Sequence, residues 1–170
     1  MAFHEISVAL AWLHIFAAIA WMGTAMFLVM VLTPSMIGLS STSRGELVSS
    51  LFPRFVRYVT FFATLTLAAG VLLTYVMFGD NLSNLAPTNP QGLRITIGAS
   101  ISLVAYVIGI GVGVRSARKI LRIMAKAQQA SQQGPMPELA KLQKRMRLAA
   151  TAVVGLLTVA LVFMVAASRL

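Results

Sequence analysis

The chain has 170 residues, of which 58% are hydrophobic and only 11% are charged. A soluble domain carries about 25% charged residues, so much of this surface is expected to face lipid instead of water. The sequence contains no cysteine, which excludes disulfides, iron–sulfur clusters, thiolate metal sites and cysteine nucleophiles.

Four apolar stretches are each long enough to cross a bilayer, which requires about 20 residues. None of them contains an acidic residue, and they cover 6–32, 55–78, 93–114 and 148–167. The chain starts without a basic n-region, and its first apolar run is too long for a signal peptide, so this run is expected to remain as a span. The predicted fold is all-α, a four-transmembrane-helix bundle that forms a single membrane domain.

Local signals mark where these helices begin and end. Thr33-Pro34 is expected to end the first span. Ser43-Arg44-Gly45-Glu46 has the spacing of a capping box and predicts a short interfacial helix before Pro53. Gly79-Asp80-Asn81 is expected to end the second span, and Asn89-Pro90 has the pattern of a cap and first turn for the third.

Residues 115–147 are predicted to form a helical hairpin that extends beyond the third and fourth spans. In its first half, basic residues recur at helical spacing, so the third helix should continue to about Gln132. Gly134-Pro135 should break it, and Pro137-Glu138 suits the first turn of a new helix. An apolar seam is then expected to lead into the fourth span: Leu139, Leu142 and Met146.

The distribution of basic residues predicts the orientation in the membrane. Nine of the 14 basic residues lie in the hairpin, whereas residues 79–92 carry none. Arg44, Arg54 and Arg57 lie in or beside the connection between the first two spans. Because basic loops stay in the cytoplasm, we expect the hairpin there and both termini on the external, periplasmic side of a prokaryotic inner membrane.

The net charge of +10 also predicts partners. The basic residues lie between apolar runs and not on a separate folded face, which favours the anionic headgroups of the lipid bilayer over nucleic acid. Other membrane subunits or a second copy of the chain are further expected partners. The 4 acidic residues all lie outside the apolar stretches, which counts against a proton-driven transporter.

His14 is the only ionisable residue deep within an apolar stretch. An imidazole in hydrocarbon is costly unless it is hydrogen-bonded or ligated, so two interpretations stand. In one, His14 is a functional ligand; in the other, it is neutral and bonded to a carbonyl or hydroxyl of a neighbouring helix. Trp21 follows two turns later on nearly the same face, and Ala17 and Ala18 leave room beside the ring.

Methionines continue along the first helix at intervals of four residues: Met22, Met26 and Met30. Thioethers and imidazole suit copper(I), and a histidine–methionine pair can also ligate haem iron. Flexible packing is the commoner use of methionine in a helix bundle. A small-residue pair in the third span, Gly109 and Gly113, predicts that another helix approaches closely there.

The segment from Trp12 to Gly23, with its His14-x6-Trp21-x-Gly23 spacing, resembles the first-helix motif of the copper-resistance D-like membrane proteins. A similar motif occurs in the HemJ-type protoporphyrinogen oxidases and in the membrane portion of certain urate oxidases. The resemblance extends over roughly residues 8–115 and includes Pro34, Arg54-Phe55 and Gly70 with Leu72. It implies a small helical bundle with a redox or metal-handling role that binds haem b or copper.

Arg94 departs from this resemblance. In the haem-binding relatives, the first-helix histidine is one axial ligand and a lysine that opens the third span is the other. His14 matches the histidine, but Arg94 stands at the lysine position, and a guanidinium has no lone pair to offer a metal. It can pair with a haem propionate or a lipid phosphate. HemJ-like oxidase activity is therefore not expected.

Several cofactor states remain open from the sequence. Haem b could be five-coordinate through His14, or could take a methionine as its second ligand, with Trp21 as a wall and Arg94 near an anionic group. Copper could be bound by His14, Met22 and Met26. With no cofactor at all, the chain would be an accessory or scaffold subunit of a larger membrane complex.

Overall fold

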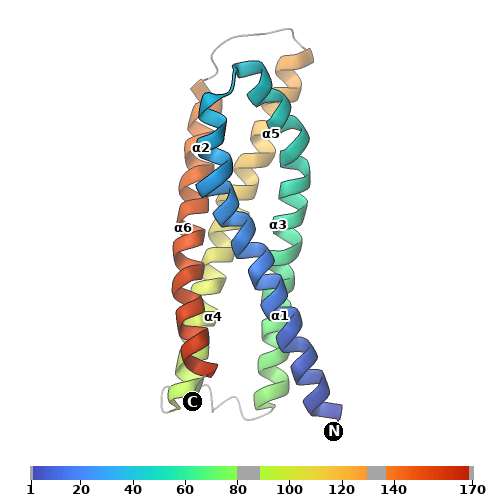
Figure 1. The fold of residues 1–170 in the computed structure, drawn as a ribbon, viewed down its shortest axis with the longest axis vertical. Coiled ribbons are helices and arrows are strands. Elements are labelled where there is room, and N and C mark those ends of the chain that lie inside the picture. The colour runs from blue at the N-terminus through green and yellow to red at the C-terminus, as the bar shows by residue number, and fades with distance from the viewer. Residues whose placement is uncertain (1, 80–88, 130–136, 169–170) are drawn as a thin grey trace.

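The computed structural model describes residues 2–79, 89–129 and 137–168, which are almost wholly helical and contain no strand. The long helices run side by side along one axis, and the two ends of the chain lie at the same end of the bundle (Figure 1). The helices are α1 (Ala2–Phe27), α2 (Thr33–Ser35), α3 (Ser41–Phe78), α4 (Pro90–Ile108), α5 (Arg115–Gln129) and α6 (Pro137–Ser168). Short π-helical turns, η1 (Leu28–Leu32) and η4 (Gly109–Val114), and a 3₁₀ turn, η2 (Met36–Gly38), join some of them.

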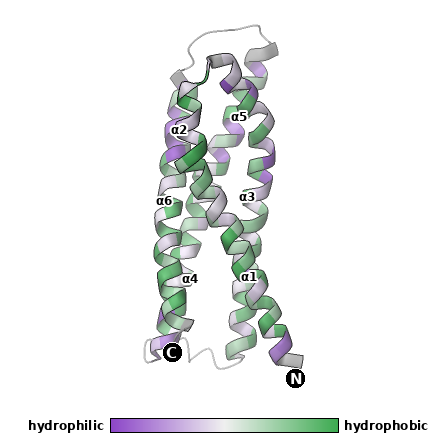
Figure 2. Cartoon of the chain, in the orientation of Figure 1, coloured by the Kyte–Doolittle hydropathy of each residue, from purple (hydrophilic) through white to green (hydrophobic). Residues whose placement is uncertain are grey.

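Four continuous helical stretches are long and apolar enough to cross a membrane, so the chain is a multi-pass membrane protein. They cover His4–Gly38, Thr42–Phe78, Pro90–Lys126 and Glu138–Ala167. The two longest have 37 residues each, or about 55 Å at about 1.5 Å per residue, well beyond the roughly 30 Å of hydrocarbon. Polar residues gather at the end of the bundle where α5 lies (Figure 2). We call this end, formed by α5 and the first turns of α3 and α6, the basic end.

The start of α3 corrects one expectation. The predicted short helix before Pro53 is part of one uninterrupted helix that reaches Phe78. Its cap is Ser40, whose hydroxyl accepts the N–H of Ser43. Proline removes a hydrogen bond from a helix interior, but buried side chains on both sides of Pro53 pack into the same core and keep the helix continuous. They are Val48, Phe52 and Val56.

The first helix also continues past its expected end. Helical structure extends through Thr33-Pro34 to Gly38 because the π-helical turn η1 widens the chain just before the proline. The N–H and the hydroxyl of Thr33 both donate to the carbonyl of Leu28, the hydroxyl over 2.6 Å. Pro34 then occupies the first turn of α2, where its missing N–H has little cost.

The remaining local signals are confirmed. Gly79 ends α3 with a φ of 53°, a left-handed conformation that favours glycine. The Asn89 side chain accepts N–H groups of the first turn of α4, and Pro90 opens that helix. The third helix continues through α5 to Gln129, and α6 begins at Pro137. The expected break at Gly134-Pro135 lies outside the described residues.

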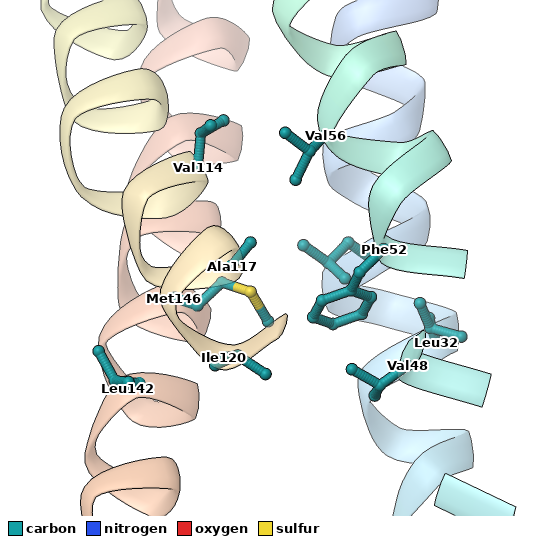
Figure 3. Packing of buried hydrophobic residues seen from close by; sticks show 10 residues of the cluster. Leu32, Val48, Phe52, Val56, Val114, Ala117, Ile120, Leu142 and Met146 are labelled. Atoms are coloured by element: carbon teal, nitrogen blue, oxygen red, sulfur yellow. The ribbon is translucent and has the colours of Figure 1, made fainter. Parts of the chain in front are cut away.

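α1 packs mainly against α3, and α4 packs mainly against α6. At the basic end, α5 contacts both α3 and α6, so three helices meet there. Side chains of α3 face side chains of η4, α5 and α6 across this end (Figure 3). We call this cluster the basic-end core: Leu28, Leu32, Val48, Phe52, Val56, Val114, Ala117, Ile120, Leu142 and Met146.

The helices approach closely where small residues allow it. A Cβ added to Gly109 would lie 3.5 Å from a methyl group of Val153, and one added to Gly113 would lie 3.9 Å from the Cβ of Ala149. Both glycines therefore face α6, as the small-residue pair predicted. Next to them lies a second cluster, the Trp21 core: Trp21, Ala25, Val59, Ala63, Ala105, Val153 and Leu157.

Candidate functional site

His14 is half-buried on α1 and its imidazole reaches α3. Its Nδ1 lies 2.8 Å from the carbonyl oxygen of Thr66. A carbonyl can only accept, so Nδ1 carries the hydrogen and donates it. The hydrogen bond therefore fixes the tautomer and leaves the lone pair on Nε2, which has no hydrogen-bond partner among the described residues.

Gly70 makes the space for this imidazole. It lies one turn after Thr66, and a Cβ added to it would lie 2.9 Å from Cε1 and 3.0 Å from Nδ1 of His14. Real side chains do not approach so closely, so the ring fits only against a bare backbone. Sequence patterns assigned Gly70 no role beyond the resemblance, and they did not single out Thr66. A glycine inside an apolar span was the available signal.

Trp21 lies within the bundle core, and its expected role as the wall of a cofactor site stays a prediction. The indole is only 2% exposed, and its ring meets that of Tyr106 edge-on, with centroids 6.4 Å apart. The Tyr106 hydroxyl lies 3.1 Å from that of Thr64, so this contact joins α1, α3 and α4. Trp21 shares a face with His14, about 10 Å further along the helix axis.

The three methionines of α1 and η1 differ in their exposure. Met22 is half-buried against the Trp21 core, Met26 is half-buried, and Met30 is 62% exposed. Met22 lies about 12 Å along the axis from His14 and about 80° around the helix. A metal bound to both residues would need the two side chains to bridge that separation.

Arg94 is held by the end of α6. Its Nη1 donates to the carbonyl of Ala166 over 3.1 Å. Carbonyls in the last turn of a helix have no donor within the helix, and a cation there interacts favourably with the helix dipole. His14 thus contacts α3 and Arg94 contacts α6, so the two residues expected near one cofactor belong to different helix pairs.

The space around these residues limits what they could hold. A cavity of about 50 Å³ lies beside Trp21 and is lined also by Gly109 and Gly113. One or two water molecules would fill it, whereas drug-sized and cofactor-sized ligands occupy about 300–1,000 Å³. The cavity beside Trp21 is therefore too small for a macrocycle.

The ligand chemistry in the described residues is sparse. They contain no group of three or more His, Asp or Glu side chains that could hold a metal ion. A metal at His14 would take its other ligands from a macrocycle, a methionine thioether or a small molecule. No protein-family model matches the chain, and comparisons with curated proteins and with solved structures find no match.

Proposed function

We propose that this membrane protein has a redox or metal-handling role and binds haem b through Nε2 of His14. The supporting observation is the hydrogen bond from Nδ1 to the carbonyl of Thr66. Metal-ligating histidines commonly donate their other ring N–H to a carbonyl or carboxylate, which orients the ring and raises its basicity. The resemblance of the first helix to copper-resistance D-like proteins implies the same role for this residue.

The donor set fits a haem with one protein ligand. Bound haem would supply one-electron transfer. Thr66 would hold the imidazole in one tautomer and Gly70 would let it lie against α3. Arg94 supplies no second ligand, because a guanidinium has no lone pair to offer a metal, and its Nη1 bonds Ala166. The separation of His14 from Met22 favours haem over a copper site that uses both side chains.

An absorption spectrum of the protein in mild detergent tests this proposal. We expect a Soret band that His14→Ala removes and that His4→Ala retains, since His4 is exposed near the start of α1 and has no place in the site. Copper would appear instead as metal in elemental analysis, lost in His14→Ala or Met22→Leu. A Soret band that survives in His14→Ala would contradict the assignment of the ligand.

The alternative is an accessory or scaffold subunit without a cofactor. It is favoured by the hydrogen bonds of the two polar residues that the sequence indicated as site residues. His14 bonds the carbonyl of Thr66, and Arg94 bonds the carbonyl of Ala166. Each bond joins two helices and stabilises the bundle without any ligand. Purified protein with neither chromophore nor metal, recovered in fixed ratio with other membrane subunits, would support this alternative over the first.

We further propose that the basic end faces the cytoplasm of a prokaryotic inner membrane and that both termini lie outside. The support is the charge distribution. The basic residues of α5 and of the first turns of α6 lie at one end of the bundle, opposite the two ends of the chain (Figures 1 and 2). Translocating so many cations is unfavourable, which is the origin of the rule that basic loops remain inside.

A further inference from the structure

A second cavity lies at the basic end, away from His14. Its volume is about 300 Å³, several times that of the cavity beside Trp21. Its floor belongs to the basic-end core and is apolar: Val48, Phe52, Ile120 and Met146. Figure 3 shows Phe52 and Met146 extending toward each other from α3 and α6. A space of this size and lining takes a ligand with an apolar part.

The other walls of this cavity are positively charged. Arg44 of α3 and Lys144 and Arg147 of α6 line it, and no Asp or Glu does. The ion pair found among the described residues joins Lys119 and Glu138 and lies elsewhere. These three cations therefore converge on one cavity without a carboxylate to neutralise them, which favours an anion.

The guanidinium of Arg44 has a buried donor that is not satisfied by the described residues. Its Nη2 donates to the carbonyls of Ile37 and Leu39, over 3.3 and 3.2 Å. Its Nε is buried and has no partner within the described part of the chain. A buried N–H without an acceptor is costly, so an anionic oxygen that reaches the guanidinium would be stabilised.

The position of the cavity identifies the ligand. Arg147 directly precedes the apolar stretch that begins at Leu148, and Thr33, which also lines the cavity, directly follows the one that ends at Leu32. The cavity thus lies where hydrocarbon gives way to the headgroup layer. A phospholipid of that leaflet presents a phosphate and an acyl chain at this depth, which matches the cationic wall and the apolar floor.

We propose that this cavity binds one anionic phospholipid, with its phosphate held by Arg44, Lys144 and Arg147 and its upper acyl chain against Phe52 and Met146. The proposal does not depend on a cofactor at His14. It requires a specific site with defined stoichiometry, beyond the general attraction of a basic surface to anionic lipid.

Native mass spectrometry of the detergent-purified chain, titrated with phosphatidylglycerol, tests the proposal. We expect one tightly bound lipid, with phosphatidylcholine binding at least tenfold more weakly. Lys144→Gln and Arg147→Gln should each weaken the first binding event about fivefold, equivalent to about 1 kcal/mol per basic residue near an anionic headgroup. Arg118→Gln and Arg122→Gln are matched controls, because both residues are exposed on α5 and do not line the cavity.

The outcomes distinguish a specific lipid site from general charge attraction and from a site for free phosphate. Equal losses in the cavity variants and the control variants would show general charge attraction and would overturn the proposal. Equal binding of the two lipids would also overturn it. Displacement of the lipid by glycerol 3-phosphate at the same concentration would show a site for free phosphate and not for lipid. Far-UV circular dichroism of each variant checks that the helices remain intact.

Discussion

His14 shows how a polar side chain is accommodated in an apolar span. Its N–H bonds a carbonyl of the neighbouring helix, and Gly70 on that helix gives the ring its space. Hydrogen bonds between membrane helices contribute about 0.6 kcal/mol on average and up to about 1.7 kcal/mol. The bond is therefore of modest strength, and its larger effect is to fix which nitrogen of the ring carries the lone pair.

Gly70→Ala should displace the imidazole. The new Cβ would lie 2.9 Å from Cε1 of His14, and overpacking of this kind costs about 1–3 kcal/mol. We expect a lower midpoint of thermal unfolding in detergent, followed by circular dichroism. Gly155→Ala is the control, since a Cβ there meets nothing within 4 Å and should leave the midpoint unchanged.

A double-mutant cycle assigns this cost to the ring. In the His14→Ala background the imidazole is gone, so Gly70→Ala should be nearly neutral. An equal cost with and without His14 would mean that the glycine serves some other contact.

Only part of this site could be predicted from the residues of one helix. His14 stands out because it is an ionisable group in an apolar run, and a carbonyl partner on a neighbouring helix was one of its two interpretations. The identity of that partner depends on the rotation and register of α3 against α1. That register is set by packing over the whole interface, so Thr66 carried no signal in its own segment.

At the level of elements, local sequence signals predicted where helices end better than they predicted where a helix continues through a proline. Asn89, Pro90 and Gly79 act within one turn of chain, and all three do what their residue types favour. Pro34 and Pro53 do not end their helices, because a π-helical turn adapts the chain before one and core packing supports the other. Propensity is overridden where tertiary contacts lie on both sides of a residue.

Gly113→Leu should separate η4 from α6. Gly113 faces Ala149 at a distance that an alanine would fill as an ordinary contact, so Gly113→Ala should be tolerated. A leucine exceeds that space and should destabilise the bundle by about 1–3 kcal/mol or more. Unfolding of the variants in detergent measures this, with Gly111→Leu as the control, since a Cβ at Gly111 meets nothing within 4 Å. Equal effects at both positions would contradict the assigned interface.

For the whole molecule, the structure combines an apolar bundle with a basic end of different character. Along the apolar part, α1 pairs with α3 and α4 with α6, and the Trp21 core joins the pairs. At the basic end, α5 lies between α3 and α6, and the ion pair of Lys119 with Glu138 links it to α6. The overall fold followed from composition and helix length, whereas this third helix contact did not, because it depends on α3 passing through Pro53.

The orientation of the molecule can be measured directly because the natural chain has no cysteine. His4→Cys places one thiol near the start of α1, and Lys126→Cys places one at the basic end; both positions are exposed. A membrane-impermeant maleimide added to intact spheroplasts should label His4→Cys alone. Lys126→Cys should react only after the membrane is opened.

This result is expected because the basic end carries its cations close together on α5 and α6, so moving it across the membrane would mean desolvating or neutralising many of them at once. The cysteine-free chain controls for background, and buried Ala117→Cys controls for reagent that reaches the bundle interior. Labelling of Lys126→Cys in intact spheroplasts, with His4→Cys protected, would reverse the orientation. It would also move the proposed lipid cavity to the outer leaflet, so the lipid titration and the labelling experiment constrain each other.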